Sequence, residues 1–349
     1  MKHIGLDGHK RWGQVSWFDT ETGELSEPER VPNDELVTEL TAIPGEKRVV
    51  IEAGPNTYYL TQALREAGLD VRVVDAFKAH RLFEALREAK TDKLDAQGLA
   101  LLSARGSLDH AEVWVPDETI RQWRELTRAR AALTRLSTMV RNHLRKLLVR
   151  QGVECPYRDL TGVRAQQWLD EEAARWPQAL QAVLAGFRAV LATLAEQVKQ
   201  LAHQIVEHTQ TSEPAERLQT IPGVGPQLAA AVVAEIGAPE RFPTAIRLRG
   251  YSGLVPQVRQ SGERRWTGPL IAGGNRHLRW ALVEIAQHFV QSRKTQDLAL
   301  VRWYRRLVHR RGPNPAKVAL ARRLLTIIFA MLRDGTPFEA ERYARSPDG

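Results

Sequence analysis

The sequence predicts a multidomain protein that combines α/β and all-α parts. An α/β domain with a mixed sheet comes first, a helical coiled-coil hairpin follows, and a mostly helical C-terminal domain ends the chain. Three observations predict this order: strands and helices alternate at the start, an apolar heptad runs through the middle, and glycine-punctuated helices follow. The length of 349 residues fits roughly two ordinary domains, with the heptad segment between them. We therefore expect domains at 1–111, 112–212 and 213–349.

The first domain is expected to begin with two strands, after which helices and strands alternate. The run Arg48–Glu52 is continuously apolar, which is typical of a strand buried on both faces. Asn33 is a plausible N-cap for the first helix. The expected strands are His3–Asp7, Gln14–Asp19, Arg48–Glu52 and Val71–Asp75, and the expected helices are 33–42, 57–67, 79–88 and 92–105.

The middle of the chain carries a heptad pattern. Its apolar residues are spaced alternately by four and three positions over more than three repeats, which predicts a coiled-coil seam. A looser version runs from Trp123 to Leu147, and a connector at about 152–177 separates the two. We expect a long antiparallel hairpin that is either an internal strut or, as we favour, a dimerisation element. The seam residues are Leu180, Leu184, Phe187, Leu191, Leu194, Val198, Leu201 and Ile205.

Composition narrows the class of protein. A hydrophobic share of 43% excludes a disordered chain. No uninterrupted apolar run of about 18 residues is present, and the N-terminus has no apolar leader, so we expect neither a membrane protein nor a secreted one. The single cysteine, Cys155, excludes an internal disulfide and a multi-cysteine metal site, which suits the cytoplasm.

The net charge of +9 is unevenly distributed. Residues 1–111 hold 14 basic and 19 acidic side chains, residues 112–212 hold 14 and 11, and residues 213–349 hold 22 and 11. A basic C-terminal part suits a phosphate backbone, whereas an acidic N-terminal part could hold cations. A solvated basic face without a partner is the alternative.

Four carboxylates stand where a metal site could form. Asp7 and Glu52 each end an expected strand, and Asp92 and Asp95 lie three apart at the start of a helix. Two divalent cations that act on a phosphate need such hard oxygen ligands on rigid elements. The structural alternatives are that Asp92 is an N-cap and Asp7 a turn residue.

The motif Ile221-Pro-Gly-Val-Gly-Pro226 leads directly into an apolar helix. Its glycines, Gly223 and Gly225, would let the backbone approach a phosphate at the helix N-terminus, as in a helix-hairpin-helix that grips DNA without reading sequence. A plain tight turn between packed helices is the competing interpretation. The motif is too short, and lacks the Lys-Ser/Thr pair, for a nucleotide P-loop.

The stretch from Arg247 to Arg279 combines arginines, glycines and two serines, Ser252 and Ser261. No histidine lies within ten residues of Ser261, so metal ions or arginines would have to stabilise charge during attack by its hydroxyl. A solvated arginine loop is the alternative. The candidate nucleic-acid contacts here are Arg264, Arg265, Trp266, Arg276 and Arg279.

Together these blocks resemble one family, the DEDD-type transposases of insertion sequences, which act as bridge-RNA-guided recombinases. IGLDGHK, IEAGP and KTDKLDAQGLA are similar to the family's RuvC-like (RNase H fold) domain. The segment from IPGVGPQLAAAVVAEIG to GGNRHLRWALVEIA is similar to its C-terminal transposase domain. The sequence departs from the family pattern at Gly8-His9 and at Ala53-Gly54-Pro55, and neither change touches an acid.

The resemblance implies roles for residues and partners. Asp7, Glu52, Asp92 and Asp95 would bind Mg²⁺, in two ions per site, and Ser261 would form a covalent phosphoserine with DNA, with Ser252 as the fallback. The acids and the serine would form a composite site, in which one subunit's acids could meet another's serine. The implied partners are double-stranded donor and target DNA, a guide RNA from the element, and further copies of the chain in a dimer or tetramer. The implied location is the bacterial cytoplasm, associated with the nucleoid, and no membrane is involved.

Two other functions remain open on the residues alone. A RuvC-like junction nuclease would use the same acids to activate water and leave the serines idle. A non-catalytic binder would use only the glycine turn and the basic C-terminal part. In an RNA-guided enzyme, the target sequence would be set by base pairing rather than by these side chains.

Overall fold

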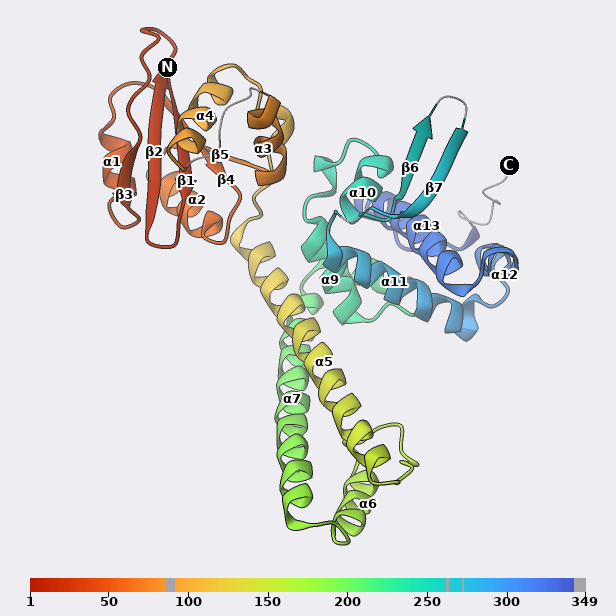
Figure 1. The fold of residues 1–349 in the computed structure, drawn as a ribbon. Helices are drawn as coiled ribbons and strands as arrows, with labels where there is room; N and C mark the ends of the chain where they lie inside the picture. The colour runs from red at the N-terminus through yellow and green to blue at the C-terminus, as the bar shows by residue number, and fades with distance from the viewer. Residues whose placement is uncertain (86–91, 262–263, 272, 342–349) are drawn as a thin grey trace. The chain divides into compact units, whose positions relative to one another are not determined.

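The computed structural model describes residues 1–349 except 86–91, 262–263, 272 and 342–349. Two compact units are present, Met1–Val115 and Pro116–Gly349. Figure 1 shows an α/β arrangement in the first unit and mostly helices in the second. The mixed α/β character expected from the sequence is therefore confirmed.

The first unit is built on a five-stranded mixed sheet in the order β3-β2-β1-β4-β5. β1 pairs in parallel with β4, and β4 with β5, while β2 and β3 are antiparallel. The short edge strand β3 was not predicted, because four residues with a single buried side chain leave almost no alternating pattern. The strands are β1 (Lys2–Gly8), β2 (Trp12–Asp19), β3 (Glu29–Pro32), β4 (Lys47–Glu52) and β5 (Asp70–Val74).

Helices cover both faces of this sheet. Ile4 and Leu6 of β1 share one hydrophobic core with Leu60 and Leu64 of α2. On the other face, Leu99 of α4 belongs to a second core that also includes residues of β4, β5 and α3. The helices are α1 (Leu36–Ala42), α2 (Thr57–Glu66), α3 (Ala76–Ala85), α4 (Asp92–Ala104) and the 3₁₀ turn η1 (Asp109–Ala111).

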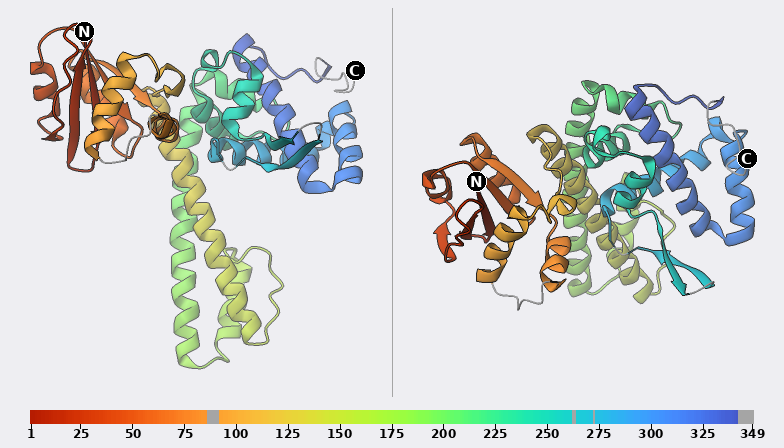
Figure 2. Two further views of the ribbon diagram at one scale, coloured as in Figure 1. Left: turned by 45° about the horizontal axis from the view of Figure 1, so that its top comes forward. Right: turned by 90° about the horizontal axis from the view of Figure 1, so that it is seen from above.

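The second unit begins with a long helical hairpin, seen in Figures 1 and 2. α5 (Glu118–Arg150) and α7 (Gln178–Gln210) run side by side, and α6 (Val163–Ala173) lies between them in sequence. Asp117 caps α5 by accepting a 2.8 Å hydrogen bond from the Ile120 amide. Leu184 and Leu191 of the heptad share a core with Val140 and Leu144 of α5. At these positions the seam packs within the chain.

We expect substitutions at two neighbouring residues of α7 to differ in their effect on stability, because only one of the side chains is packed. Leu191 is 1% exposed and Val190 is 49% exposed. Leu191→Ala leaves a cavity in the hairpin core and is expected to lower the free energy of unfolding by about 2–4 kcal/mol. Val190→Ala is expected to change it by no more than about 0.5 kcal/mol. Chemical denaturation followed by circular dichroism measures both, and equal effects would contradict the internal seam.

α7 is long and apolar enough to cross a membrane by length and composition alone, with a mean hydropathy of 1.4 over 18 residues. It is the one such helix in the described part of the chain. The sequence argument considered only uninterrupted apolar runs, so it did not identify this helix. Only 11% of this window is buried within the chain, where α7 packs along α5 through Leu184 and Leu191.

The C-terminal helices surround α9, whose residues from Ala229 to Ile236 are all buried. α9 contacts α5, α7, α8 and α11. Between α10 and α11 the chain forms a two-stranded hairpin that the sequence argument did not predict. The elements are α8 (Glu213–Gln219), α9 (Pro226–Ile236), η2 (Pro239–Arg241), α10 (Ala245–Ser252), β6 (Pro256–Ser261), β7 (Arg264–Leu270), α11 (Arg276–Gln291), η3 (Arg293–Thr295), α12 (Ala299–Arg311) and α13 (Pro313–Asp334).

Candidate active site

Asp7 and Glu52 lie at the same edge of the sheet. β1 and β4 pair in parallel from Lys2 opposite Lys47 to Leu6 opposite Ile51. One further step in this register sets Asp7 beside Glu52, and both are partly exposed whereas Leu6 and Ile51 are fully buried. Because residues that are level in neighbouring strands share a face of the sheet, the two carboxylates lie on the same side.

α4 runs antiparallel to β1. Ser103, near the end of α4, hydrogen bonds with its Oγ to Nδ1 of His3 at 2.8 Å. The helix also lies directly on the strand at Gly5, where a Cβ atom would be 2.0 Å from the Ala96 carbonyl oxygen. Only glycine permits this close approach, which fixes α4 against β1.

This antiparallel contact brings Asp95 level with Asp7. Along the helix axis, Asp95 lies about 12 Å from Ser103. Along the strand, Asp7 lies about 13 Å from His3, which is bonded to Ser103, and in the same direction. Asp95 is 8% exposed, unlike most surface carboxylates. The start of α4 and the carboxyl ends of β1 and β4 therefore lie at one edge of the first unit.

The loops that follow Asp7 and Glu52 are tied to each other by hydrogen bonds. Asn56 donates from Nδ2 to the His9 carbonyl at 2.7 Å, and Asn33 donates to the same carbonyl at 3.1 Å. The N-cap of α1 is Glu35, so Asn33 does not cap this helix as the sequence suggested. Thr57 accepts a 2.6 Å bond from the Gly54 amide and fixes the turn after Glu52. These bonds hold the backbone that follows each of the two acids in place.

Three of the four predicted acids can thus be placed, and the fourth only in part. Asp92 is the first residue of α4, one turn before Asp95, and its side chain lies outside the described part of the chain. Among the described residues, no group of three or more His, Cys, Asp or Glu side chains is close enough to hold a metal ion. His9 adds a nitrogen 3.2 Å from Oδ2 of Asp7. Carboxylate oxygens at one rigid edge nevertheless have the chemistry that Mg²⁺ requires.

Ser261 is the last residue of β6 and pairs with Arg264 of β7. The backbone therefore places it at the end of β6 opposite Arg264, and the neighbouring pair is Gln260 with Arg265. The side chains of Ser261, Arg264, Arg265 and Trp266 lie outside the described part. A Ser-Gly pair between stretches that could form strands was the sequence signal for this hairpin.

The base of this hairpin is tightly built. Gly253 has φ +68°, and a Cβ there would lie 2.6 Å from the Gly273 carbonyl oxygen. Arg279 donates to the carbonyl oxygens of Ser252, Ile271 and Gly273 at 3.4, 3.4 and 2.5 Å. Arg279, predicted as a nucleic-acid contact, thus joins the two chain segments at the base of the hairpin.

Ser252, the alternative nucleophile, is fully buried. Its hydroxyl donates to the Arg249 carbonyl at 2.8 Å and accepts a 3.3 Å bond from the Leu254 amide. Both partners belong to the C-terminal end of α10 and the turn after it. The hydroxyl therefore ends a helix and is not exposed to a substrate in this structure.

The glycine turn joins α8 to α9 and packs against α11. Gly223 has φ +88°, and a Cβ there would lie 2.8 Å from the carbonyl carbon of His288. Internal packing is thus sufficient to explain the glycine at 223. At Gly225, the N-cap of α9, a Cβ would meet nothing closer than 3.8 Å. Of the two glycines, Gly225 is therefore the one whose backbone a phosphate has room to approach.

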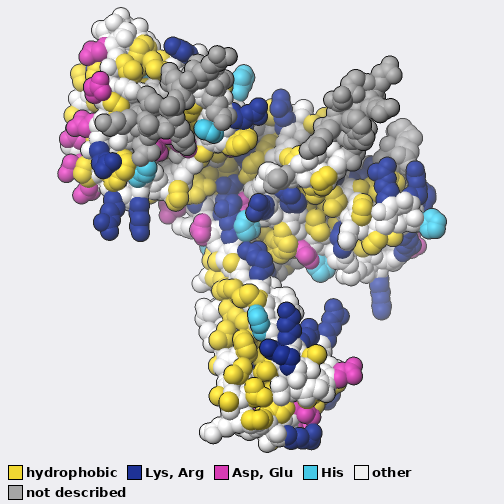
Figure 3. All heavy atoms as spheres, in the orientation of Figure 1, with side chains coloured by type: hydrophobic (Ala, Val, Ile, Leu, Met, Phe, Trp, Pro, Cys, Tyr) yellow, Lys and Arg dark blue, Asp and Glu magenta, His cyan; other side chains and the backbone are white. Residues whose placement is uncertain are grey.

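Basic side chains gather over the C-terminal helices, as the dark blue atoms in Figure 3 show. Residues 242–333 hold 18 Lys and Arg and three acids. Arg276, at the start of α11, is exposed. This surface has the charge needed to bind a phosphate backbone.

The structure also reveals a buried ionic cluster that was not predicted. Glu235 is fully buried, and its carboxylate accepts hydrogen bonds from Arg128 at 2.7 and 2.8 Å and from Asn275 at 2.7 Å. Arg124 lies 3.7 Å away, and Tyr251 donates to the Glu235 carbonyl. The cluster joins α5, α9 and α10 to the N-cap of α11. Its sequence signal was a single acid inside the apolar helix PQLAAAVVAEI.

Comparisons with known proteins agree across both units. A transposase model for DEDD-type IS110 elements matches residues 4–151, and the model of the transposase IS116/IS110/IS902 family matches residues 215–301. The chain is 28% identical over 286 residues to a probable family 20 transposase of Pseudomonas aeruginosa, covering 81% of this chain and 83% of that protein. It is 27% identical to the IS1111A transposase of Coxiella burnetii, covering 95% and 90%.

The matched segments contain the features described above. Residues 4–151 include Asp7, Glu52 and both acids of α4, and residues 215–301 include the glycine turn and the β6–β7 hairpin. The chain belongs to the DEDD-type transposases of insertion sequences.

Proposed function

We propose that this transposase cleaves and rejoins DNA strands through a covalent phosphoserine, with divalent cations held by its acids and with an RNA guide that selects the DNA. The observation that carries the proposal is the gathering of Asp7, Glu52 and Asp95 at one edge of the first sheet. Rigid strand ends and a helix fixed on Gly5 would keep these carboxylates in place through the reaction.

The acids are proposed to bind two Mg²⁺ ions. Asp7 and Glu52 lie next to each other in the parallel register, and Asp95 lies level with Asp7 on α4. Asp92 is three residues earlier on the helix and shares its face with Asp95. When bound, the ions neutralise phosphate charge and stabilise the leaving oxygen.

Ser261 is proposed as the nucleophile. A bond forms between its Oγ and the phosphorus while a bridging P–O bond of the DNA strand breaks. The serine hydroxyl loses its proton, and the departing oxygen gains one and becomes a hydroxyl on the released strand end. Attack by a hydroxyl from another strand reverses the step, frees the serine and rejoins the DNA without ATP. Arg264 and Arg265, opposite Ser261 and Gln260 in the hairpin register, supply positive charge beside the turn.

The basic C-terminal surface is proposed to bind double-stranded donor and target DNA and the guide RNA. Its excess of Lys and Arg supports phosphate binding, and the open space at Gly225 supports a helix-hairpin-helix contact. Base pairing with RNA would then select the DNA sequence, which frees the protein from reading bases.

Self-association is proposed to use the outer face of the helical hairpin. The heptad seam is occupied by α5, whereas Val183 and Val190 of α7 are 45% and 49% exposed. Leu136 and Met139 of α5 are 43% and 51% exposed. Figure 3 shows hydrophobic side chains along this hairpin. Exposed apolar side chains at helical spacing favour contact between copies.

A denaturing gel tests this function. The protein is incubated with DNA, the candidate RNA from the non-coding end of the element and Mg²⁺, then denatured and examined for a protein–DNA adduct. We expect an adduct with the wild type and none with Ser261→Ala. Ser252→Ala is the matched serine control and should keep the adduct if the variant folds, because the Ser252 hydroxyl is buried and bonded within α10 and the turn after it.

Other outcomes would assign other functions. Strand cleavage that survives Ser261→Ala but is lost in Asp7→Ala would indicate a nuclease that activates water. An adduct that persists in Ser261→Ala and is absent in Ser252→Ala would show that the serine assignment is wrong. Binding without any metal-dependent chemistry would leave a nucleic-acid-binding protein.

A further inference from the structure

A pocket of about 480 Å³ lies between α10, α12 and α13. Arg249 of α10 and Trp303 of α12 line it from two sides, and one face of α13 supplies Arg322, Arg323 and Ile327. α13 packs against both other helices, so the pocket is part of the folded unit. Its volume falls in the range of sites for small molecules and is much larger than an inorganic phosphate needs.

The polar side of this pocket is positively charged, because Arg249, Arg322 and Arg323 line it. No hydrogen bond or ion pair joins the guanidinium of Arg249 or Arg322 to an acceptor in the described residues. Burial lowers the pKa of Arg322, and the nearby charge of Arg249 lowers it further. Two like charges in a partly buried pocket are unfavourable until an anion lies between them.

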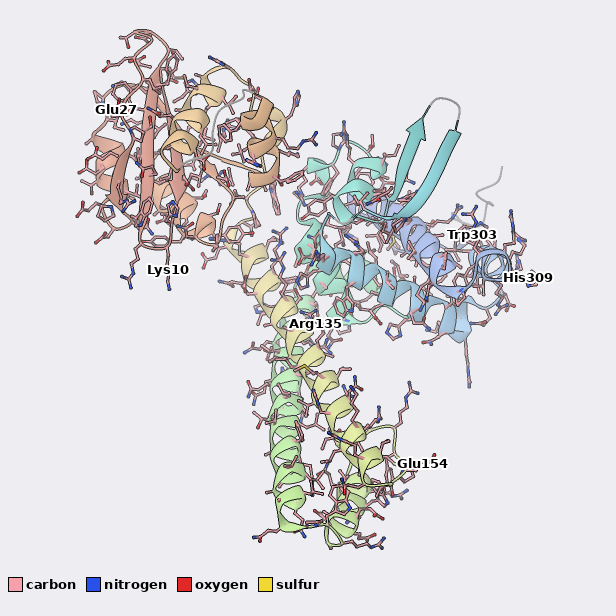
Figure 4. The ribbon with its side chains drawn as sticks, in the orientation of Figure 1. Lys10, Glu27, Arg135, Glu154, Trp303 and His309 are labelled. Carbon is pink, nitrogen blue, oxygen red and sulfur yellow. The ribbon has the colours of Figure 1, made fainter. Side chains whose placement is uncertain are left out.

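The other side of the pocket is flat and apolar. Trp303 is partly buried and packs on the main core, while Figure 4 shows it on α12 beside α13. The Arg323 guanidinium carbon lies 6.0 Å from the centre of the Trp303 ring. Ala319, Ile327 and Ala330 add further apolar lining, and Thr326 adds a hydroxyl. A planar, uncharged ring can stack on such a surface, and indole is a strong stacking partner.

We propose that this pocket binds one unpaired nucleotide of a nucleic-acid strand, with its phosphate between Arg249 and Arg322 and its base against Trp303. The ligand needs an anionic group and a flat ring in one molecule, and a nucleotide has both. A paired base inside a duplex cannot enter, because its faces are covered by neighbouring bases. The inference rests on the proposed function in one respect, which is that the strand belongs to the DNA or the RNA that the transposase binds.

Fluorescence anisotropy with labelled 12-mers tests the proposal on the full-length protein. The probes are oligothymidylate, oligouridylate, an abasic 12-mer with the same phosphates, and a 12-base-pair duplex. Trp303→Leu removes the stacking surface but keeps an apolar side chain, and Trp303→Phe retains an aromatic ring. Arg322→Ala removes one phosphate contact. Arg164 is exposed on α6, at the end of the helical hairpin. Arg164→Ala is the control, because it also removes one positive charge but does so outside the pocket.

The proposal predicts a specific pattern. Trp303→Leu should weaken binding of oligothymidylate or oligouridylate about tenfold and leave the abasic 12-mer and the duplex within twofold. Trp303→Phe should recover most of the loss. Arg322→Ala should weaken both base-containing and abasic single strands about fivefold and reduce the slope of log affinity against log salt by about one. Arg164→Ala should stay within twofold.

The two nucleic acids distinguish the source of the nucleotide. A loss confined to oligouridylate identifies the RNA, a loss confined to oligothymidylate identifies an opened DNA strand, and equal losses show that either can enter. Equal effects of Trp303→Leu on base-containing and abasic strands, or of Arg322→Ala and Arg164→Ala on affinity, would overturn the proposal. If these occur while the covalent adduct still forms, the pocket inference fails and the proposed function stands.

Discussion

Asparagine in place of Asp7 is expected to reduce Mg²⁺-dependent DNA breakage at least about 100-fold without unfolding the protein. Loss of residues that only orient metal ligands typically costs 10- to 100-fold, and loss of a ligand should cost more. Asn has the same shape as Asp but lacks its charge, so it binds Mg²⁺ poorly. Asp7 is partly exposed at a strand end, where this change leaves no cavity. The rate of cleavage of labelled DNA at several Mg²⁺ concentrations measures the effect.

Asp19→Asn is the matched control. Asp19 also ends a strand of this sheet, but it pairs with Lys2 at the opposite end of β1. Its removal should leave cleavage unchanged, because Asp7 is five strand residues away, or about 17 Å. Equal activity of Asp7→Asn and the wild type, with intact folding by circular dichroism, would show that the acids at this edge do not serve catalysis.

The second large effect concerns stability. Glu235→Gln is expected to lower the free energy of unfolding of the second unit by about 3–5 kcal/mol, since it removes the charge that compensates Arg128 and Arg124. For a unit of this size the transition temperature should fall by about 10 °C. Glu240→Gln, at an exposed position five residues later, is the control and should change little. Calorimetry of the full chain compares the two variants.

The same cluster predicts a dependence on pH. Burial by itself raises the pKa of Glu235, but hydrogen bonds from Arg128 and Asn275 and the charges of Arg128 and Arg124 hold it below its usual value of 4.5. A carboxyl with a lowered pKa stabilises the fold above the unfolded pKa, and this contribution is lost as pH falls through the folded pKa. The difference in stability between wild type and Glu235→Gln should therefore shrink below about pH 4.5. A difference independent of pH would contradict an ionised Glu235.

Regular pattern made much of the fold predictable from the sequence. The parallel strands β1, β4 and β5 are short, largely apolar runs. The apolar pattern also predicts helices at 226–236 and 276–292, and α9 and α11 begin and end within a residue of these bounds. The candidate acids could be identified because each ends a strand or begins a helix. What the sequence could not show was the contact of Gly5 with α4, which brings residues about 90 positions apart to one edge.

Residues with two possible partners could not be assigned from pattern alone. A heptad is equally apolar whether its partner is the same chain or another, and the packing of Leu184 and Leu191 on α5 selects the first. Asn33 looked like a helix cap, but it holds the His9 carbonyl instead. Ser252 and Ser261 are each followed by glycine, and the sequence could not show that the Ser252 hydroxyl is buried at the end of a helix.

Identification of the amino acid bound to DNA tests the central claim most directly. The adduct formed with Mg²⁺ is isolated under denaturing conditions, digested with nuclease and protease, and sequenced by tandem mass spectrometry. Our account predicts a nucleotide attached through phosphate to Ser261, and no adduct when Mg²⁺ is chelated or Asp7 is replaced by Asn. A nucleotide on any other residue, or cleaved DNA with no attached protein, would contradict it.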